Sequence, residues 1–261
     1  MAGETAYTRF AEFYDAYVGD YAQDIPFYLQ LASACGSPVL EVGCGTGRVL
    51  PPLLRAGLTV TGVDISDEML SLARKKLAQE GLAKSCLVNH DFAAAPLPGG
   101  QFALALVTFY TFNYLPTPDR QSSFLKTLAA CLRPGARIVM HLFYPLPLHQ
   151  SELADRWVDK GSYRIGGVDV TLHDKRRMLD ERLEERIQVF RFASGRQEEI
   201  RTVRRFVDSR EARQLLLRAG FTNLNFAEDF APGNLRPLAE EDMTTEQEYV
   251  VVGDRVGDRT P

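Results

Sequence analysis

A glycine-rich turn limits the folds open to this chain more than any other segment. It reads Val39-Leu-Glu-Val-Gly-Cys-Gly-Thr-Gly-Arg-Val49, an apolar run followed by three glycines and a helical pattern. Glycine is needed where the chain turns sharply or where backbone must approach a ligand closely. A loop at a helix start also offers free N–H groups. The segment therefore predicts a strand-turn-helix unit that binds a nucleotide or an amino-acid carboxylate.

Short apolar runs alternate with helical patterns up to about residue 145. Strands are expected at 38–42, 58–63, 85–89, 102–108 and 137–143, with helices at 47–56, 67–80 and 119–132. Strands that alternate with helices imply right-handed crossovers and a parallel sheet. The pattern therefore predicts an α/β fold with a doubly wound, Rossmann-like core.

Apolar and charged residues alternate in the next stretch, at 168–172, 182–190 and 198–206. This period of two predicts antiparallel strands with one face in water. The arginine clusters there have acidic neighbours, and we interpret them as a solvated strand face. A helix at 209–219 and strands near 221–228 and 246–253 complete the chain. The predicted divisions are a helical lid at 1–35, a ligand-binding core at 36–160, an antiparallel β insertion over the active site at 161–207, and a completion of the core sheet at 208–261.

Composition narrows the function classes. The chain has 261 residues and a formal net charge of −4, which disfavours nucleic acid and anionic lipid as partners. Its four cysteines lack zinc-ligand spacing, so we predict free thiols and no metal site. Neither a secretory signal nor a long apolar stretch is evident, so we expect a cytoplasmic protein without membrane contact. The oligomeric state stays open, with a homodimer as one option.

The turn departs from two familiar nucleotide motifs. The third glycine of G-x-G-x-x-G falls on Arg48, and no Gly-Lys-Ser or Gly-Lys-Thr follows.

Glu41, just before the glycines, suits a ligand with a positive amino or sulfonium group. Asp64 ends the second expected strand, where an acid can accept both ribose hydroxyls, and Ser66 is the better cap for the next helix. A tight turn without any ligand and a dinucleotide oxidoreductase stay open as alternatives.

Four segments in order carry a resemblance to a family: Glu-Val-Gly-Cys-Gly-Thr-Gly at 41–47, Val-Asp-Ile-Ser at 63–66, Asn-His-Asp-Phe at 89–92 and Leu-Arg-Pro-Gly at 132–135. Together they resemble the motifs of class I S-adenosylmethionine-dependent methyltransferases. The N-terminal tyrosines are similar to those of small-molecule members, including amino-sugar N,N-dimethyltransferases and glycine methyltransferases. The resemblance implies a seven-stranded sheet whose last strand is antiparallel. It also implies S-adenosylmethionine as cofactor and S-adenosyl-L-homocysteine as product.

The resemblance also implies a role for each matching position. The implied cofactor contacts lie at strand ends or in the entry helix: Tyr14, Tyr21, Glu41, Gly43, Cys44, Gly45, Asp64, Ile65, Met69, Asp91, Phe92, Thr108 and Phe109. Asp64 would hold the ribose and Asp91 the adenine amino group. The candidates for orienting or deprotonating the acceptor are Tyr14, Tyr110, Asn113 and His141.

The acceptor is less constrained than the cofactor. Residues 108–115 read Thr-Phe-Tyr-Thr-Phe-Asn-Tyr-Leu, without the Asn/Asp-Pro-Pro-aromatic motif of enzymes that methylate nucleic-acid amino groups. We therefore expect in-line transfer of a methyl group to a nitrogen or oxygen of a small metabolite. Methylation of RNA, transfer of another group from the same cofactor, and a non-catalytic regulator that only binds S-adenosylmethionine stay open.

Overall fold

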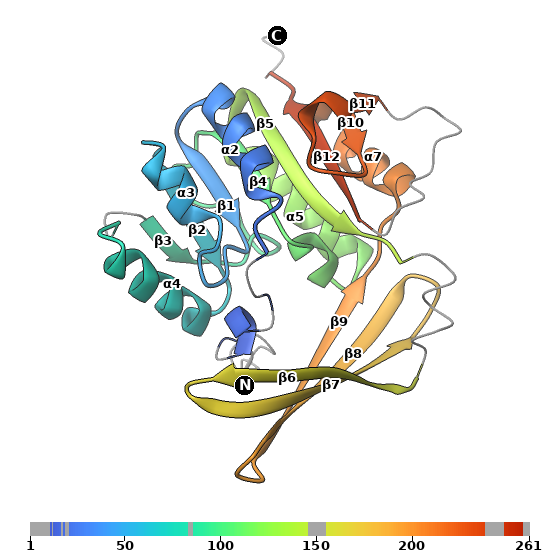
Figure 1. Ribbon diagram of the computed structural model, residues 1–261. Helices are drawn as coiled ribbons and strands as arrows, with labels where there is room; N and C mark the ends of the chain where they lie inside the picture. The colour runs from blue at the N-terminus through green and yellow to red at the C-terminus, as the bar shows by residue number, and fades with distance from the viewer. Residues whose placement is uncertain are drawn as a thin grey trace.

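The chain forms two β-sheets, one flanked by helices and one that extends from the main body (Figure 1). The computed structural model describes residues 11, 13–16, 18, 21–82, 86–145, 155–237 and 248–257. Among these segments, no helix combines the length and the apolar composition that crossing a bilayer requires.

The larger sheet has the strand order β11-β10-β12-β5-β4-β1-β2-β3. Its strands are β1 (Val39–Val42), β2 (Val60–Asp64), β3 (Cys86–Asn89), β4 (Phe102–Val107), β5 (Leu132–Phe143), β10 (Phe221–Ala227), β11 (Arg236–Pro237) and β12 (Glu248–Arg255). Strands β1 to β5 pair in parallel, and β12 runs antiparallel to β5 and β10. The doubly wound core is therefore confirmed.

The sheet has eight described strands, whereas seven were predicted. The extra strand is β11, two residues that pair with Asn225 and Phe226 of β10. A pair of residues that includes a proline shows no alternation, so sequence periodicity does not reveal it.

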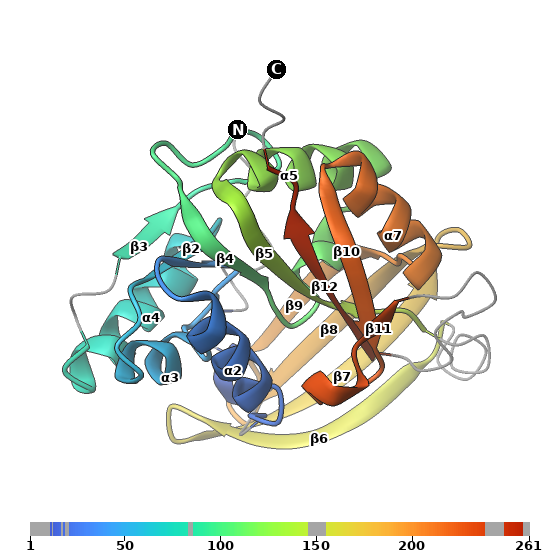
Figure 2. The same cartoon turned by 90° about the horizontal axis from the view of Figure 1, so that it is seen from above.

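Helices cover both faces of the larger sheet (Figure 2). One face packs against α2 (Ile25–Cys35), α3 (Leu50–Arg55) and α4 (Asp67–Gln79), and the other against α5 (Pro118–Ala130) and α7 (Ser209–Arg218). Strands buried on both faces read as continuous apolar runs, as β1 and β4 do. Helix α3 begins three residues later than predicted, because the turn extends through Gly47, whose φ is +83°.

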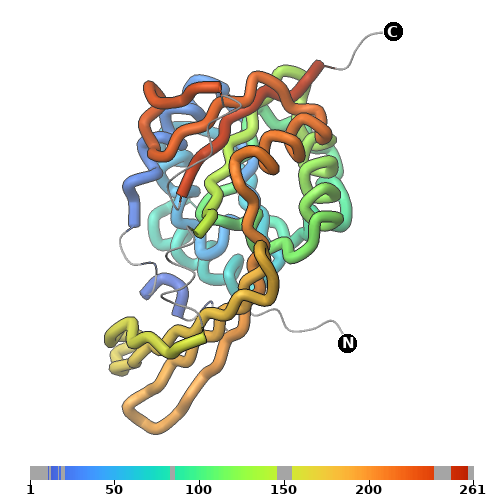
Figure 3. Tube along the Cα trace, turned by 90° about the vertical axis from the view of Figure 1, so that its right-hand side faces the viewer, coloured from blue at the N-terminus to red at the C-terminus, as the bar shows by residue number. Residues whose placement is uncertain are grey.

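The smaller sheet is an antiparallel meander of β6 (Trp157–Ile165), β7 (Val168–Met178), β8 (Leu183–Phe192) and β9 (Gln197–Arg205). We call it the insertion sheet; Figures 1 and 3 show it projecting below the larger sheet. It covers 157–205, close to the predicted insertion at 161–207, and the other predicted divisions stay predictions. Away from this sheet's connection to the core, Phe190 of β8 packs on the N-terminal helical residues, and its ring stacks on that of Phe13 with centroids 4.3 Å apart.

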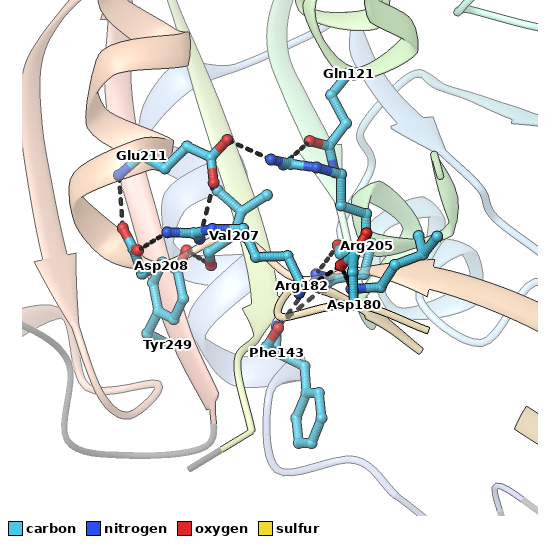
Figure 4. Close-up of polar contacts among 11 residues, drawn as sticks. Gln121, Phe143, Asp180, Arg182, Arg205, Val207, Asp208, Glu211 and Tyr249 are labelled. Carbon is cyan, nitrogen blue, oxygen red and sulfur yellow. Dashed lines mark hydrogen bonds and ion pairs between the residues drawn. The ribbon is translucent and has the colours of Figure 1, made fainter. Parts of the chain in front are cut away.

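The joint between the insertion sheet and the core is a polar network (Figure 4). Arg205, at the end of β9, donates hydrogen bonds to Gln121 of α5 and to Glu211 of α7, at 2.6 and 2.8 Å. Nearby, Arg182 donates to Asp208 at 2.7 Å. These contacts tie the insertion sheet to two core helices and so fix its position over the carboxyl ends of the parallel strands.

Candidate active site

A cavity of about 560 Å³ lies between the larger sheet and the insertion sheet. This volume is in the range of small-molecule binding sites. Most of the predicted site residues line it: Tyr14, Tyr21, Gly43, Gly45, Asp64, Ile65, Met69, Asp91, Phe92, Phe109 and Tyr110. The remaining predicted residues, Glu41, Cys44, Thr108, Asn113 and His141, lie outside its lining.

The glycine-rich turn folds back on the end of β2. The N–H groups of Gly43 and Cys44 both donate to the Val63 carbonyl, at 2.8 and 3.0 Å, and that of Gly45 donates to Asp64 Oδ2 at 2.9 Å. The expectation that these glycine-turn amides are free for a ligand is therefore wrong, because the turn uses them to hold its own shape. Cys44 contributes to the turn through its backbone and not as part of the cavity wall.

Glycine at position 43 is required by space as well as by conformation. Its φ is +72°, and a Cβ built there would lie 2.3 Å from Thr111 Oγ1. The turn and the 3₁₀ helix η1 (Thr111–Tyr114) are thus in contact, with no room for a side chain between them. The turn therefore lines the cavity with backbone atoms, which a ligand can approach closely because the glycines have no side chains.

Asp64 lies at the carboxyl end of β2 with both oxygens oriented by backbone. Oδ1 accepts the N–H of Ser66 and Oδ2 that of Gly45, each at 2.9 Å. Ser66 caps α4 by accepting the N–H of Met69 at 3.2 Å, as predicted. A carboxylate has about four lone-pair sites, so each oxygen can accept a further hydrogen bond from a ligand hydroxyl.

Glu41 is a buried acid behind the cavity wall. It is 1% exposed, and its Oε2 has no hydrogen-bond partner in the described part of the chain. Thr108 Oγ1 donates to its other oxygen at 3.4 Å. Burial raises the pKa of Glu41 to about 8. A buried carboxyl group with an unsatisfied oxygen favours a cationic ligand nearby, because burying a charge requires a partner.

Asp91 lines the cavity together with the apolar residues Ile65 and Phe92. The carboxylate of Asp91 accepts hydrogen bonds from Arg120 Nη2 and from the Ala93 N–H, both at 2.8 Å. The predicted contact with an adenine amino group would share an oxygen with one of these donors. Ile65 is 47% exposed, and Phe92 is buried.

Arg48 has a structural role that its sequence position did not reveal. Its guanidinium makes two hydrogen bonds, of 2.6 and 2.7 Å, to the buried carboxylate of Asp24. It also lies 5.2 Å from the ring centroids of Tyr21 and Phe109. The pair therefore joins the N-terminal segment to the turn and positions two aromatic residues of the lining.

Two predicted catalytic candidates are linked by a residue that sequence reasoning missed. His141 Nε2 lies 3.3 Å from Glu248 Oε2, and Tyr110 hydrogen-bonds to the same carboxylate. The His141 contact holds the pKa of Glu248 below its ordinary value, and burial raises that of Tyr110. Tyr110 and Glu248 line the cavity, whereas His141 is fully buried behind them. Tyr110 is also held at a φ of +65°, a strained conformation typical of functional sites.

Asn113 and Tyr14 have different surroundings from each other. Asn113 is fully buried, donates to the carbonyls of Phe143 and Arg205 at 3.2 and 2.9 Å, and accepts the Phe143 N–H. The structure therefore does not bring Asn113 to the cavity; its amide joins η1 to β5 and β9. Tyr14 does line the cavity, and burial raises the pKa of its hydroxyl, which stays neutral.

The insertion sheet corrects the interpretation of its arginines as a solvated face. Successive residues point to opposite faces of a strand. Arg177 and Arg201 are on the outer face, with side chains 52% and 55% exposed. Arg176 and Arg204 are on the inner face and line the cavity, together with Arg186, Gln188 and Thr202. The period of two was visible in the sequence, but which face meets the core was not.

Comparison with known proteins gives a match in the core. Residues 39–135 match the protein family described as "Methyltransferase domain". An uncharacterized methyltransferase of Geobacillus sp. (strain WCH70) is 36% identical over 109 residues, which are 42% of this chain and 48% of that protein. A dTDP-3-amino-3,4,6-trideoxy-alpha-D-glucopyranose N,N-dimethyltransferase of Streptomyces venezuelae is 28% identical over 61% of this chain and 66% of the relative. The chain spans about half the length of the first curated relatives it matches.

Solved structures extend the likeness to the whole chain. A crystal structure of an S-adenosylmethionine-dependent methyltransferase from Clostridium acetobutylicum has a TM-score of 0.78 and covers 97% of this chain and 100% of that one. At 18% sequence identity this likeness shows the fold. The structural likeness confirms the predicted Rossmann-like fold, and the family match lies within its core, at residues 39–135.

Proposed function

We propose, taking residues 39–135 as a methyltransferase domain, that this chain binds S-adenosylmethionine and transfers its methyl group to a nitrogen, or an oxygen, of a small metabolite. The observation that carries this proposal is the cavity of about 560 Å³, which joins the glycine-rich turn and Asp64 to the inner face of the insertion sheet. Such a cavity has room for a cofactor at one end and an acceptor at the other.

The residues of the turn fit a ligand of this kind. When bound, S-adenosylmethionine supplies a methyl group on a cationic sulfur, which an acceptor nitrogen or oxygen takes up by in-line displacement. Glu41 offers a buried carboxyl group with an unsatisfied oxygen for the cationic part, and Asp64 offers lone pairs for ribose hydroxyls. Ile65, Met69 and Phe92 offer apolar contact for an adenine ring.

The other residues of the site would align the acceptor and exclude water. An amine must lose a proton as it becomes methylated. Glu248 lines the cavity as a carboxylate, because the His141 contact lowers its pKa, so it would accept a hydrogen bond from the acceptor N–H and orient the amine, while the proton leaves to solvent. The hydroxyls of Tyr14 and Tyr110 stay protonated because burial raises their pKa, so they would orient the acceptor without acting as bases. The Streptomyces venezuelae relative is an N,N-dimethyltransferase, which supports nitrogen as the methylated atom.

Two measurements test this proposal. Titration calorimetry should show binding of S-adenosylmethionine and no binding of NAD. Transfer of a tritiated methyl group should then be found with one of a panel of amines, amino sugars, phenols and carboxylates, with tRNA as a control. Binding of NAD alone would overturn the proposal. Labelled tRNA would favour RNA as substrate, and cofactor binding without transfer to any panel member would favour a regulatory role.

A further inference from the structure

The inner face of the insertion sheet presents hydrogen-bond donors that nothing in the described residues accepts. Three buried nitrogens there have no hydrogen-bond partner: Arg176 Nε, Gln188 Nε2 and Arg204 Nε. All three residues line the cavity. Gln188 is 3% exposed and the Arg204 side chain 5%, so water has little access to either. Buried donors without acceptors are costly and uncommon in native proteins.

Positive charge exceeds negative charge on the same face. Asp174 is taken by Arg186, which makes hydrogen bonds of 2.9 and 2.8 Å to its two oxygens. Glu184 accepts a hydrogen bond from Arg204 Nη2 at 2.6 Å. Arg176 is left with a more distant contact, because its Nε lies 3.6 Å from Asp174 Oδ2, beyond hydrogen-bond distance. Near the cavity this face thus has three guanidinium groups for two carboxylates, because the third carboxylate of the face, Glu198, is bonded to Arg196 at 3.0 Å.

Arg176 is placed unfavourably for the protein alone. It lies directly opposite Arg186 in the β7–β8 register. Like charges in opposite positions of an antiparallel pair destabilise it. Burial lowers the pKa of Arg176, and the charges of Arg186 and Arg204 lower it further. An arrangement that costs stability without a ligand is typical of a binding site.

We infer that the donors of Arg176, Gln188 and Arg204 bind an anionic oxygen group, a carboxylate or a phosphate, carried by the methyl acceptor. This inference rests on the proposed function and names the class of its substrate. A guanidinium group matches the geometry of both anions and is preferred for their recognition. The cavity lining itself has three carboxylates, and each has other partners: Asp64 accepts backbone N–H groups at the turn, Asp91 contacts Arg120, and Glu248 contacts His141.

Aromatic rings hold one of the three donors in place. The Arg204 guanidinium carbon lies 5.3 Å from the ring centroid of Phe143 and 5.5 Å from that of Phe206. With one nitrogen bonded to Glu184, its orientation is fixed before a ligand arrives. The anion would therefore bind to a preorganised edge, which places the rest of the acceptor toward the turn.

The first test measures anion binding directly. Wild-type protein saturated with S-adenosyl-L-homocysteine is titrated with inorganic phosphate, acetate and the neutral analogue acetamide, and binding is followed by NMR. We expect saturable binding of phosphate or acetate and none of acetamide, with the tighter anion indicating the natural group. In Arg176→Met the affinity should fall at least tenfold, and in the outer-face control Arg177→Met it should stay within twofold. Equal binding of acetamide, or equal losses in the two variants, would overturn the inference.

A stability measurement separates a binding role from a structural one. Arg176→Met removes one member of a like-charge pair and leaves Arg186 bonded to Asp174, so the melting temperature of the unliganded variant should be unchanged or higher. Gln188→Leu, a second variant that adds no charge, should also weaken anion binding severalfold. A lower melting temperature for Arg176→Met with unchanged anion affinity would mean that the arginine serves the fold, and would overturn the inference.

Paired acceptors test the inference in catalysis. Glycine is compared with glycinamide, and glucosamine 6-phosphate with glucosamine, in the tritiated-methyl assay. The anionic member of a methylated pair should have a kcat/KM at least tenfold higher, and Arg176→Met should abolish this preference; equal use of both members would overturn the inference. Failure to bind S-adenosylmethionine would instead overturn the proposed function. In that case, titration of the cofactor-free protein with phosphate and acetate would still show whether the inner face of the insertion sheet binds anions.

Discussion

At the end of the cavity formed by the glycine-rich turn the lining includes the carboxylates of Asp64 and Asp91, whereas at the insertion-sheet end it includes the guanidinium groups of Arg176, Arg186 and Arg204. We call these the turn end and the sheet end. The turn end is shaped by the backbone, because its glycines have positive φ and backbone N–H groups donate hydrogen bonds to the carboxylate oxygens of Asp64. The sheet end is shaped by long side chains on a regular antiparallel sheet. The difference suits a cationic cofactor of constant structure at one end and an acceptor whose identity can differ among relatives at the other.

The largest expected effect concerns the backbone of the turn end. Gly43→Ala should lower the free energy of unfolding by about 2–5 kcal/mol, because a residue with a Cβ is strained at positive φ and would clash with Thr111. Urea unfolding measures this loss. The matched control is Gly57→Ala, where φ is +82° but nothing lies within 4 Å, and the loss should be about 1–2 kcal/mol. Equal losses would show that space at the turn is not limiting.

The next effect concerns a side chain of the turn end. Asp64→Asn should weaken S-adenosylmethionine binding by about 1.5–3 kcal/mol, because hydrogen bonds from ribose hydroxyls to a charged acceptor become bonds to a neutral one. Titration calorimetry measures the change. Asp67→Asn makes the same substitution at an exposed position of α4 and should leave the affinity unchanged. Unchanged affinity in a folded Asp64→Asn protein would remove the ribose role.

The pH dependence of cofactor binding tests whether an acid at the turn end binds the cationic cofactor. The pKa of Glu41 is raised by burial to about 8, so the acid is mainly protonated in the free protein at neutral pH. If Glu41 ionises to hold a cationic cofactor, the affinity for S-adenosylmethionine should fall about tenfold per pH unit below 8, or about 1.4 kcal/mol. Binding measured from pH 6 to 9 tests this, and Glu41→Gln should remove the dependence.

The same group predicts the stability of the unliganded protein. Because the folded pKa lies above the ordinary value of 4.5, the unfolded chain releases a proton that the folded chain keeps between pH 4.5 and 8. The contribution of Glu41 to stability is therefore complete below pH 4.5 and is lost as pH rises to about 8. Denaturant unfolding of the wild type and of Glu41→Gln over this range should differ in slope; parallel curves would contradict the raised pKa.

The smallest expected effect is on the outer face of the insertion sheet. Arg177 forms an exposed ion pair of 2.6 Å with Glu185, its direct neighbour across β7 and β8. Exposed pairs contribute little, so Arg177→Ala should change the free energy of unfolding by less than about 1 kcal/mol and leave methyl transfer intact. Denaturant unfolding and the transfer assay check both. A large loss of activity would mean that the two faces of this sheet do not differ in function as proposed.

Local pattern determined the core and the cofactor end of the site. The continuous apolar runs predicted the parallel strands, since strands buried on both faces need such residues. The glycines at 43 and 45 both have positive φ, and Ser66 caps α4 and leaves Asp64 oriented into the cavity. These features depend on a few consecutive residues, and the physics of turns and caps acts at that range.

Tertiary structure decided everything that joins distant segments. Glu248 reaches His141 because β12 pairs with β5 in antiparallel register, and no spacing in the chain signals that contact. Likewise, Arg48 reads as a missing glycine until Asp24 is seen to bind it. Alternation along β7 and β9 places their arginines on two opposite faces of the sheet. Only the packing of the sheet over the cavity determines that Arg176 and Arg204 are on the inner face. The period of a strand defines two faces, and the rest of the molecule selects which one is buried.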